Sequence, residues 1–556
     1  MIIDPTKNKK DAAFCQYFKT NTADSKCMYN TANFYIRNTM TGLKKSPEER
    51  THLETEVLHY VFTGIQKANE VIGQKNMKKK FTELKLAEVG GMDSAVIAFS
   101  IVSHEPFQYP TEEKWFLSYG TLDAIFKFTD NPVYRRMNSH VNQNAIRKAI
   151  AAWQGYFESL KAYRKNPAGF TGKPKIPGYK QGKEYTAWFS KQVAKLKEED
   201  GRCYIQFVNN PDRFAIGKAS LYGDLKYVKT EVKAMYGKYY ILITFDDKIA
   251  ESEAPENPKR ILGLDPGVNN FLGVANNFGG APFVMNGRAV KSANQRFNKN
   301  RAKLISSVTK GSDSKSSVKY SKQLNILSQR RESFLRDYFY KCAWYICRYA
   351  KAADVDVIVM GHNDGQKQEI DLKDNVNQNF VSIPYTKFIT ILKTVASKCG
   401  IAVVIREESY TSQASLLDMD DMPTYKKGEN KKYAFSGKRI HRGLYMSKNG
   451  TLLNADINGA ANILRKEYPN AFDGIKDFTY LCVTTISIGY KDLYRNANAC
   501  AGRPKPYKYH KSGRYTVVRH MERSHKKCEY CKLWGKGKFV WRPDKNEQDT
   551  QHGKAA

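Results

Sequence analysis

Three short stretches, far apart in the sequence, place acidic residues directly after apolar runs or at the start of a helical pattern. They are Ile261-Leu-Gly-Leu-Asp265-Pro-Gly-Val-Asn-Asn270, Val403-Val-Ile-Arg-Glu407-Glu408-Ser-Tyr-Thr-Ser412 and Asn454-Ala-Asp456-Ile-Asn458-Gly-Ala-Ala-Asn462-Ile463. A carboxylate at the end of a buried strand is held rigidly and partly away from water, as a metal ligand requires. If these acids act together, the fold must bring all three stretches to one point.

The order of the predicted elements after residue 259 favours a mixed α/β sheet. A strand at 260–264 and a hairpin candidate from 271 precede a helical region at 290–352, a buried strand at 354–360, a helix at 383–398 and another buried strand at 401–406. A helix at 456–466 carries the last acid, with apolar residues at helical spacing facing inward: Ile457, Ala460, Ala461 and Leu464. Strands first, then strands alternating with helices, are typical of an RNase H-like sheet.

The first 255 residues predict a helical part followed by a β-rich part. Apolar residues recur at helical spacing within 54–66 and 142–163. Residues 165–181 form a Pro/Gly/Lys connector, which is either a plain linker or an extended segment that contacts a nucleic-acid backbone. Runs at 202–208 and 238–245 favour a small barrel or sandwich.

The charge of the chain indicates its partner. Lys and Arg total 91 against 55 Asp and Glu, a formal net charge of +36, which favours a polyanion such as nucleic acid. A membrane surface is the rival partner, but we find no long basic amphipathic helix and no apolar run of about 18 residues. The first residues lack the apolar core of a signal peptide, and ten scattered cysteines form no disulfide framework, so we expect reduced thiols in a cytoplasm.

Each acid also has an ordinary structural interpretation. Asp265 is typical of a turn, Asp456 of an N-cap, and Glu407 and Glu408 of an exposed strand end. Successive strand residues face opposite ways, so only one of the two glutamates can face a metal shared with Asp265, and alternation does not decide which. Three such carboxylates predict two Mg²⁺ ions about 4 Å apart at a scissile phosphate.

The sequence resembles the TnpB family, transposon-encoded RNA-guided DNA nucleases related to the compact type V CRISPR effectors. The resemblance covers residues from about 110 to 466 and rests on a combination of four stretches. They are residues 115–122 together with 138–153, residues 163–180, Gly263-Leu-Asp265-Pro-Gly-Val-Asn-Asn270 and Asp456-Ile-Asn-Gly-Ala-Ala-Asn-Ile463.

The resemblance implies a multidomain α/β protein. It predicts a β-barrel wedge domain at 1–20 and 166–255, a helical recognition lobe at 21–165, an RNase H-like (RuvC) nuclease domain at 256–475 with a basic insert at 409–453, and a basic C-terminal tail at 476–556. It also implies a structured guide RNA, a double-stranded DNA target beside a short flanking motif, and a prokaryotic cytoplasm. The rival functions are an RNA-guided DNA-binding protein without cleavage and a DNA transposase.

The sequence departs from most of the family at the second acidic motif. Most relatives carry a Glu directly after the strand that corresponds to 355–360, where this chain has Gly361. A subgroup instead uses a Glu just before the Thr-Ser of the later strand, which corresponds to Glu408. The resemblance therefore implies Asp265, Glu408 and Asp456 as catalytic and Mg²⁺-binding residues, with Glu407 as the alternative to Glu408.

The chain also lacks the four-Cys zinc element that relatives carry between the second and third motifs. Ser415 stands where the first Cys would fall, and residues 409–455 contain no Cys, so we predict no metal there. One other zinc candidate exists, with four ligand-type side chains but without the second Cys pair of a zinc ribbon: His520, His525, Cys528 and Cys531. We do not predict zinc as a cofactor.

Basic residues in three segments are predicted to contact nucleic acid. They lie in the connector, in the helical region after the first acid and in the basic insert: Lys173, Lys175, Lys180, Arg296, Arg301, Lys303, Arg330, Arg331, Lys438, Arg439 and Arg442. A solvated helix face is the alternative interpretation of the helical ones.

Overall fold

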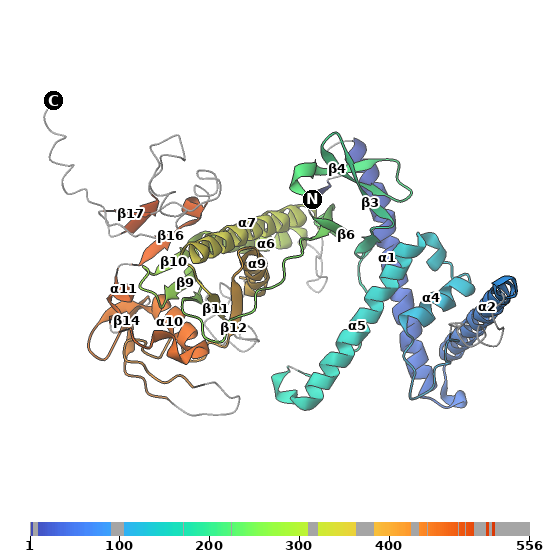
Figure 1. Ribbon diagram of the computed structural model, residues 1–556, viewed down its shortest axis with the longest axis horizontal. Coiled ribbons are helices and arrows are strands. Elements are labelled where there is room, and N and C mark those ends of the chain that lie inside the picture. Colours follow the sequence, from blue (N-terminus) through green and yellow to red (C-terminus); the bar gives the residue numbers. More distant parts are fainter. Residues whose placement is uncertain are drawn as a thin grey trace. The chain divides into compact units, whose positions relative to one another are not determined.

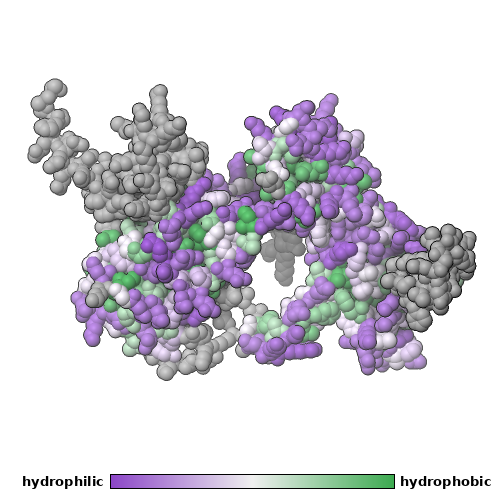
Figure 2. Space-filling model, viewed as in Figure 1, coloured by the Kyte–Doolittle hydropathy of each residue, from purple (hydrophilic) through white to green (hydrophobic). Residues whose placement is uncertain are grey.

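The computed structural model divides the chain into two compact units, Met1–Lys248 and Ile249–Ala556 (Figure 1). It describes residues 2–3, 9–90, 105–170, 172–223, 225–309, 321–362, 383–423, 433–441, 443–475, 477–483, 485–493, 507–510 and 514–517. No helix within these ranges combines the length and apolar character needed to cross a bilayer. Figure 2 shows hydrophilic residues over much of the visible surface of each unit.

Helices in the first unit pack around one apolar core (Figure 1). They are α1 (Lys9–Leu43), α2 (His52–Gly90), α4 (Tyr119–Phe128) and α5 (Ser139–Lys165), with short 3-10 turns at Pro47–Glu49, Tyr134–Arg136 and Pro167–Gly169. Trp153 of α5 is buried in this core and donates from Nε1 to Oδ1 of Asn33 on α1 at 2.9 Å. The helical predictions for 54–66 and 142–163 are therefore confirmed.

Two antiparallel sheets complete the first unit. One has the order β1 (Ile2–Ile3), β7 (Lys238–Asp246), β6 (Lys226–Met235), β2 (Ala187–Ser190), and the other has β3 (Ala194–Glu199), β4 (Arg202–Phe207) and β5 (Arg213–Lys218). They share one core with Phe14 and Phe18 of α1. No strand in the described ranges belongs to both sheets, so of the two predicted alternatives these strands form a sandwich of two sheets on one core and not a closed β-barrel. Tight turns, such as the one at Asp200 and Gly201 with positive φ, return each strand of the second sheet to its neighbour.

A six-stranded mixed sheet organises the second unit. Its order is β12 (Ala402–Arg406), β11 (Val357–Gly361), β8 (Ile261–Pro266), β9 (Asn270–Asn276), β10 (Phe283–Asn286), β16 (Ile486–Ile488). β8, β9 and β10 are antiparallel, β11 and β12 continue parallel to β8, and β16 is parallel to β10. The predicted strands and hairpin are confirmed, but β12 is an edge strand, so most of it is half-buried and not fully buried.

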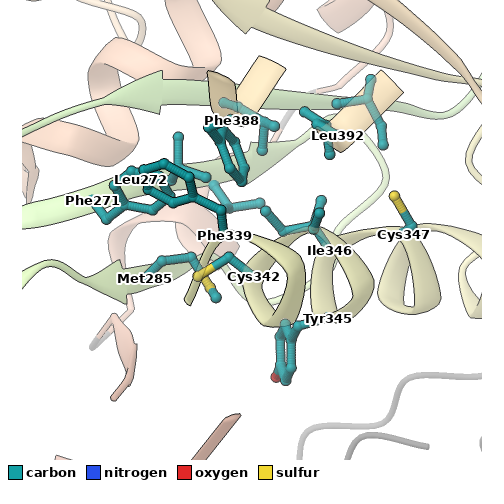
Figure 3. Packing of buried hydrophobic residues seen from close by; sticks show 14 of the residues in the cluster. Phe271, Leu272, Met285, Phe339, Cys342, Tyr345, Ile346, Cys347, Phe388 and Leu392 are labelled. Carbon is teal, nitrogen blue, oxygen red and sulfur yellow. The ribbon is translucent and has the colours of Figure 1, made fainter. Parts of the chain in front are cut away.

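Helices cover both faces of this sheet. On one face, α7 (Lys322–Ala352) and α9 (Tyr385–Lys398) pack on alternate strand residues, and Figure 3 shows Phe271 of β9 facing Phe339 and Phe388. Helix α6 (Arg288–Thr309) precedes α7. On the other face lies α10 (Ala455–Glu467), and its four residues predicted to face inward are fully buried there: Ile457, Ala460, Ala461 and Leu464. This burial on both faces holds the ends of β8 and β11 rigidly.

The remaining elements of the second unit are short. The insert before α10 contains the antiparallel strands β13 (Lys438–His441), β14 (Leu444–Met446) and β15 (Leu452–Asn454). A 3-10 turn at Pro469–Phe472 and α11 (Thr479–Cys482) follow α10, and β17 (Tyr507–His510) pairs with β18 (Arg514–Val517). The insert therefore leads directly into the helix that carries Asp456.

Candidate functional site

Asp265 lies at the end of β8 on the face that α10 covers. Leu262 and Leu264 belong to the core under α7 and α9, whereas Ile261 packs with α10, so strand alternation turns Asp265 toward α10. A Cβ built on Gly459 of α10 would lie only 2.5 Å from Oδ2 of Asp265. The carboxylate therefore contacts α10 at a residue one helical turn from Asp456.

Asp456 lies in the first turn of α10, but it is not the N-cap. Asn454 takes that position, and its side chain accepts from the backbone N–H of Asp456 at 2.9 Å. The carboxylate of Asp456 accepts from Nδ2 of Asn270 at 2.5 Å. Gly273, the cross-strand partner of Asp265, lies against the backbone of Asp456, so the helix approaches the sheet closely here.

Glu408 lies beside the end of β11. Met360 pairs with Leu264, so Gly361, the next residue of β11, lies next to Asp265 across the parallel pair. A Cβ on Gly361 would lie 2.8 Å from Oε2 of Glu408. A carboxylate from a later part of the chain thus occupies the space into which a side chain at position 361 would project.

Glu407 faces a different part of the molecule. Strand β12 ends at Arg406, so both glutamates lie beyond the ladder and strand alternation does not sort them. Glu407 pairs with Lys466 Nζ at 2.6 Å, and it also accepts from the backbone N–H of Ser409 at 2.7 Å. The Lys466 side chain is 3% exposed and belongs to the last turn of α10, whereas Asp456 belongs to the first.

The acids act on one another electrostatically. Burial raises the pKa of Asp265 well above its usual range, the charges of Glu408 and Asp456 raise it further, and Arg439 partly offsets them. Burial, followed by the charges of the same three acids, also raises the pKa of Tyr385. Arg439 of β13 lies 3.9 Å from Asp456 and is 47% exposed, so a cation from the insert reaches this group of carboxylates. We call Asp265, Glu408 and Asp456 the acidic edge.

Residues that sequence analysis did not single out support the acidic edge. The hydroxyl of Tyr385 donates to the carbonyl of Gly267 at 2.5 Å, and its ring stacks on Phe271 at 5.4 Å, which fixes the turn after Asp265. Asn270 holds Asp456. A signal was available in the sequence, because glycines occur in the first and third acidic stretches and at position 361, but only the structure shows that a helix and a carboxylate occupy the space they leave.

The donors of the acidic edge fit an open magnesium site better than a closed metal cage. In the described ranges, no three His, Cys, Asp or Glu side chains form a ready-made metal cluster. Mg²⁺ takes one or two carboxylates and completes its shell with waters and substrate oxygens, so it needs no such cluster. The negative charges of Glu408 and Asp456, which help to raise the pKa of the buried Asp265, favour a cation among the three carboxylates.

The predicted nucleic-acid-binding residues occupy different environments. Exposed ones are Lys173, Lys175, Arg296, Arg301, Lys303, Arg330, Lys438 and Arg439. Lys180 is half-buried, and Arg331 donates to Asn294 of α6 at 2.7 Å and lies over the ring of Phe297, so it also packs α7 against α6. The remaining predicted residues lie outside the described ranges: Arg442, His520, His525, Cys528 and Cys531.

The segment around Ser415 is held by carboxylates. Ser415 is buried and donates from its hydroxyl to Asp418 at 2.6 Å, and its backbone N–H donates to Asp420 at 2.8 Å. Asp418 also accepts from the backbone N–H of Lys448 at 2.9 Å, and Asp420 from that of Ser436 at 3.0 Å. These hydrogen bonds tie the start of the insert to its hairpin.

The fold and the acidic edge together define an α/β protein with an acidic site at the carboxyl ends of its central strands. Residues 241–366, which contain the first acidic motif, match the model of OrfB_IS605, a family described as probable transposase. The resemblance to the TnpB family is thus confirmed over this segment. No curated protein sequence matches the chain.

Solved structures with similar folds include CRISPR effectors. A Cas12f1–sgRNA–target DNA complex has 13% identity, covers 73% of this chain and 82% of its own, and gives a TM-score of 0.40. A CRISPR–Cas12f ternary complex has 13% identity with coverages of 74% and 81% and a TM-score of 0.27. An AacC2c1–sgRNA binary complex has 10% identity with coverages of 63% and 64% and a TM-score of 0.26. With such values, these likenesses add nothing to what the chain's own residues show.

Proposed function

We propose that the chain is an RNA-guided, metal-dependent endonuclease that cuts double-stranded DNA matched by a guide RNA beside a short flanking motif. The observation that carries the proposal is the acidic edge, where Asp265, Glu408 and Asp456 come together from three distant stretches. The family match over residues 241–366 and the net charge of +36 support a nucleic-acid substrate.

The fold supports an RNase H-like (RuvC) nuclease domain at 256–475. An antiparallel meander of three strands, extended by two parallel strands beside its first strand, is the arrangement that such a domain requires. We assign the recognition lobe to 21–165 and the wedge to 1–20 and 166–255, and separate cores for helices and sheets in the first unit support this division.

The residues of the acidic edge would hold two Mg²⁺ ions, which when bound polarise the scissile phosphate and lower the pKa of a water nucleophile. Asn270 and Tyr385 keep Asp456 and the turn after Asp265 in position. Arg439 is the cation beside this edge, and its exposed guanidinium is available to a phosphate oxygen. Glu407 holds Lys466 and takes no part in binding the metal.

The guide RNA and its heteroduplex with the target would lie along basic residues of both units. In the first unit these are Lys173, Lys175 and Lys180. In the second unit we assign this role to Arg296, Arg301, Lys303, Arg330, Arg331, Lys438, Arg439 and Arg442. Contacts spread over so many residues make binding insensitive to any one acid of the acidic edge.

Plasmid cleavage by protein purified with its co-expressed guide RNA tests the proposal. We expect Mg²⁺-dependent cutting of a plasmid that carries the guide match and flanking motif, and loss of cutting in Asp265→Ala and Asp456→Ala with retained RNA binding. Glu407→Gln is the matched control and should still cut. Parallel loss of RNA binding in the aspartate variants would mean that these acids are structural, and the proposal would fail.

The same assay separates the rival functions. Wild-type protein that binds the matched plasmid but does not cut it at any Mg²⁺ concentration is an RNA-guided DNA-binding protein. An RNA-free preparation that joins DNA strands is a transposase.

A further inference from the structure

The outer face of the β1–β7–β6–β2 sheet in the first unit carries lysines beside an aromatic ring. Alternation along β6 puts Lys229, Glu231 and Lys233 on one face, and Trp188 of β2 lies directly across from Glu231. The residue between two of them, Val232, is fully buried in the core on the opposite face. The lysine-bearing face of this sheet is therefore turned away from the core.

Two lysines from other elements join this face. Lys148 Nζ of α5 lies 5.5 Å from the ring centroid of Tyr185 and 5.8 Å from that of Trp188. Lys180 Nζ of the connector lies 5.1 Å from the ring centroid of Tyr185, and Lys229 Nζ lies 4.3 Å from that of Trp188. We call Lys148, Lys180, Lys229 and Lys233 the lysine cluster.

Glu231 compensates only part of this charge. It lies 3.0 Å from Lys229 and 3.8 Å from Lys233. Burial lowers the pKa of Lys148 most, and with the charges of Lys233, Lys229 and Lys180 and the opposing charge of Glu231 the pKa is about 8. The ammonium groups are therefore held together at an electrostatic cost that an anion would remove.

The connector is fixed where it contributes Lys180. The backbone N–H of Lys180 donates to Oδ1 of Asn30 at 2.8 Å, and the side-chain amide of Asn33 donates to the carbonyl of Pro177 at 3.1 Å. The connector is thus bound to α1 and does not behave as a plain linker. An open hollow of about 250 Å³ between α1, α5 and the connector adjoins Lys180, with Tyr156 and Lys175 in its lining.

We propose that the lysine cluster binds a phosphodiester group of a nucleic-acid strand. The inference rests on the proposed function and deepens it, because it names where the first unit holds the strand. The rings of Tyr185 and Trp188 already hold the ammonium groups, so little side-chain freedom is lost when a phosphate binds. The hollow beside Lys180 gives the strand room to continue along the connector.

Binding in metal-free buffer tests the inference with RNA-free full-length protein, a labelled RNA strand and a labelled DNA duplex of the same sequence. The test variant is Lys148→Met/Lys229→Met. The control, Lys195→Met/Lys197→Met, removes the same charge from exposed positions of β3. We expect the test variant to lose at least about tenfold in affinity for one of the two probes. Its slope of log affinity against log salt should be shallower by about 0.7 for RNA or about 0.9 for duplex, because one phosphate contact is lost.

The outcomes separate failure of this inference from failure of the proposed function. Loss for the RNA strand alone assigns the phosphodiester to RNA, and loss for the duplex alone assigns it to DNA. Equal behaviour of the test and control variants overturns the inference while leaving the acidic edge untouched. Wild-type protein that binds neither probe overturns the proposed function as well. Competition by polyglutamate as strong as that by RNA would replace the nucleic acid with an acidic polypeptide.

A charge-conserving variant keeps the inference testable if the double variant misfolds. Lys148 faces Glu231, Lys180, Lys229, Lys233 and the hydroxyl of Tyr185. As pH rises through about 8, Lys148 loses its proton, so the wild-type affinity should fall. The arginine of Lys148→Arg stays protonated, so this variant should lose less affinity than the wild type over the same rise in pH. Titration of the neighbouring groups affects both proteins alike. Identical pH profiles would contradict a phosphate at Lys148.

Discussion

The acidic edge of the second unit and the lysine cluster of the first are groups of like charge that their folds hold partly away from water. Burial and two neighbouring carboxylates raise the pKa of Asp265, and burial and three neighbouring lysines lower the pKa of Lys148 to about 8. Burial and neighbouring like charges raise the pKa of a carboxyl group and lower the pKa of an ammonium group. Each region is therefore suited to an ion of the opposite charge, a divalent cation in one and a phosphate in the other.

The two regions differ in how tightly they are built. At the acidic edge, a Cβ on Gly361 or Gly459 would lie within 3 Å of a carboxylate oxygen. In the lysine cluster, flexible side chains lie 4.3–5.8 Å from ring centroids. A site assembled by close backbone approach tolerates little change, whereas long side chains on aromatic rings can readjust. We therefore expect larger effects from substitutions at the acidic edge.

The largest effect is expected from Glu408→Gln. If Glu408 replaces the carboxylate that relatives carry at the position of Gly361, cleavage should fall by more than about a thousandfold, since roughly 4 kcal/mol of transition-state stabilisation is lost. RNA and DNA binding through the basic residues should change less than about twofold. Single-turnover plasmid cleavage and a binding assay measure the two quantities.

Glu407→Gln is the matched control for that prediction. It should cleave normally and lower the free energy of unfolding by about 1–2 kcal/mol, because the buried ammonium of Lys466 loses a charged partner. Loss of cleavage in Glu407→Gln together with normal cleavage in Glu408→Gln would reverse the assignment.

Gly361→Ala tests the tightness of the acidic edge without removing any carboxylate. The added methyl group would lie 2.6 Å from Cδ1 of Ile463 and 2.8 Å from Oε2 of Glu408, so both side chains must move. A displacement of about 1 Å at a catalytic group can cost a hundredfold in rate, and we expect a loss of about ten- to a hundredfold. Gly155→Ala on α5, where an added Cβ meets no atom within 4 Å, is the control. Full activity of Gly361→Ala would show that the edge is as adaptable as the lysine cluster.

Arg439→Gln probes the cation that, among the described residues, lies beside Asp456. We expect cleavage to fall about three- to tenfold, less than the hundredfold typical of a buried donor, because the guanidinium is 47% exposed. The Mg²⁺ concentration for half-maximal cleavage should not rise, because removing the positive charge of Arg439 reduces the repulsion of Mg²⁺. Lys438→Gln, on the neighbouring residue of β13, is the control. A higher Mg²⁺ requirement in Arg439→Gln would mean that Arg439 orders the acids.

The sequence allowed us to propose the acidic edge, but of the lysine cluster it indicated only Lys180. Asp265, Glu408 and Asp456 each follow or open a recognisable element, so strand and helix patterns were enough to propose that they meet. Alternation could not separate Glu407 from Glu408, because β12 ends at Arg406.

The lysine cluster depends on contacts that no local pattern records. Lys148 and Lys229 are two among 91 basic residues, and although Lys148 lies in a stretch that carries the family resemblance, nothing in the sequence marks either lysine as an anion ligand. Only the packing of α5 against β2, which pairs with β6, brings them together around Trp188. The choice between barrel and sandwich stayed open for a related reason, since strand patterns predict neighbours within a sheet but not whether two sheets close.

The smallest effect is expected from Tyr385→Phe, which removes one hydrogen bond to the carbonyl of Gly267 beneath the turn after Asp265. The free energy of unfolding should fall by about 0.5–1.5 kcal/mol. Tyr338→Phe removes a similar buried hydrogen bond, to the carbonyl of Asn286 at 2.9 Å, and should cost about as much. Of these two tyrosines, Tyr385 is the one that contacts the turn of the acidic edge, so Tyr385→Phe should also slow cleavage and Tyr338→Phe should not. Chemical denaturation and single-turnover cleavage of both variants compare them, and equal cleavage rates would mean that Tyr385 stabilises the core without positioning Asp265.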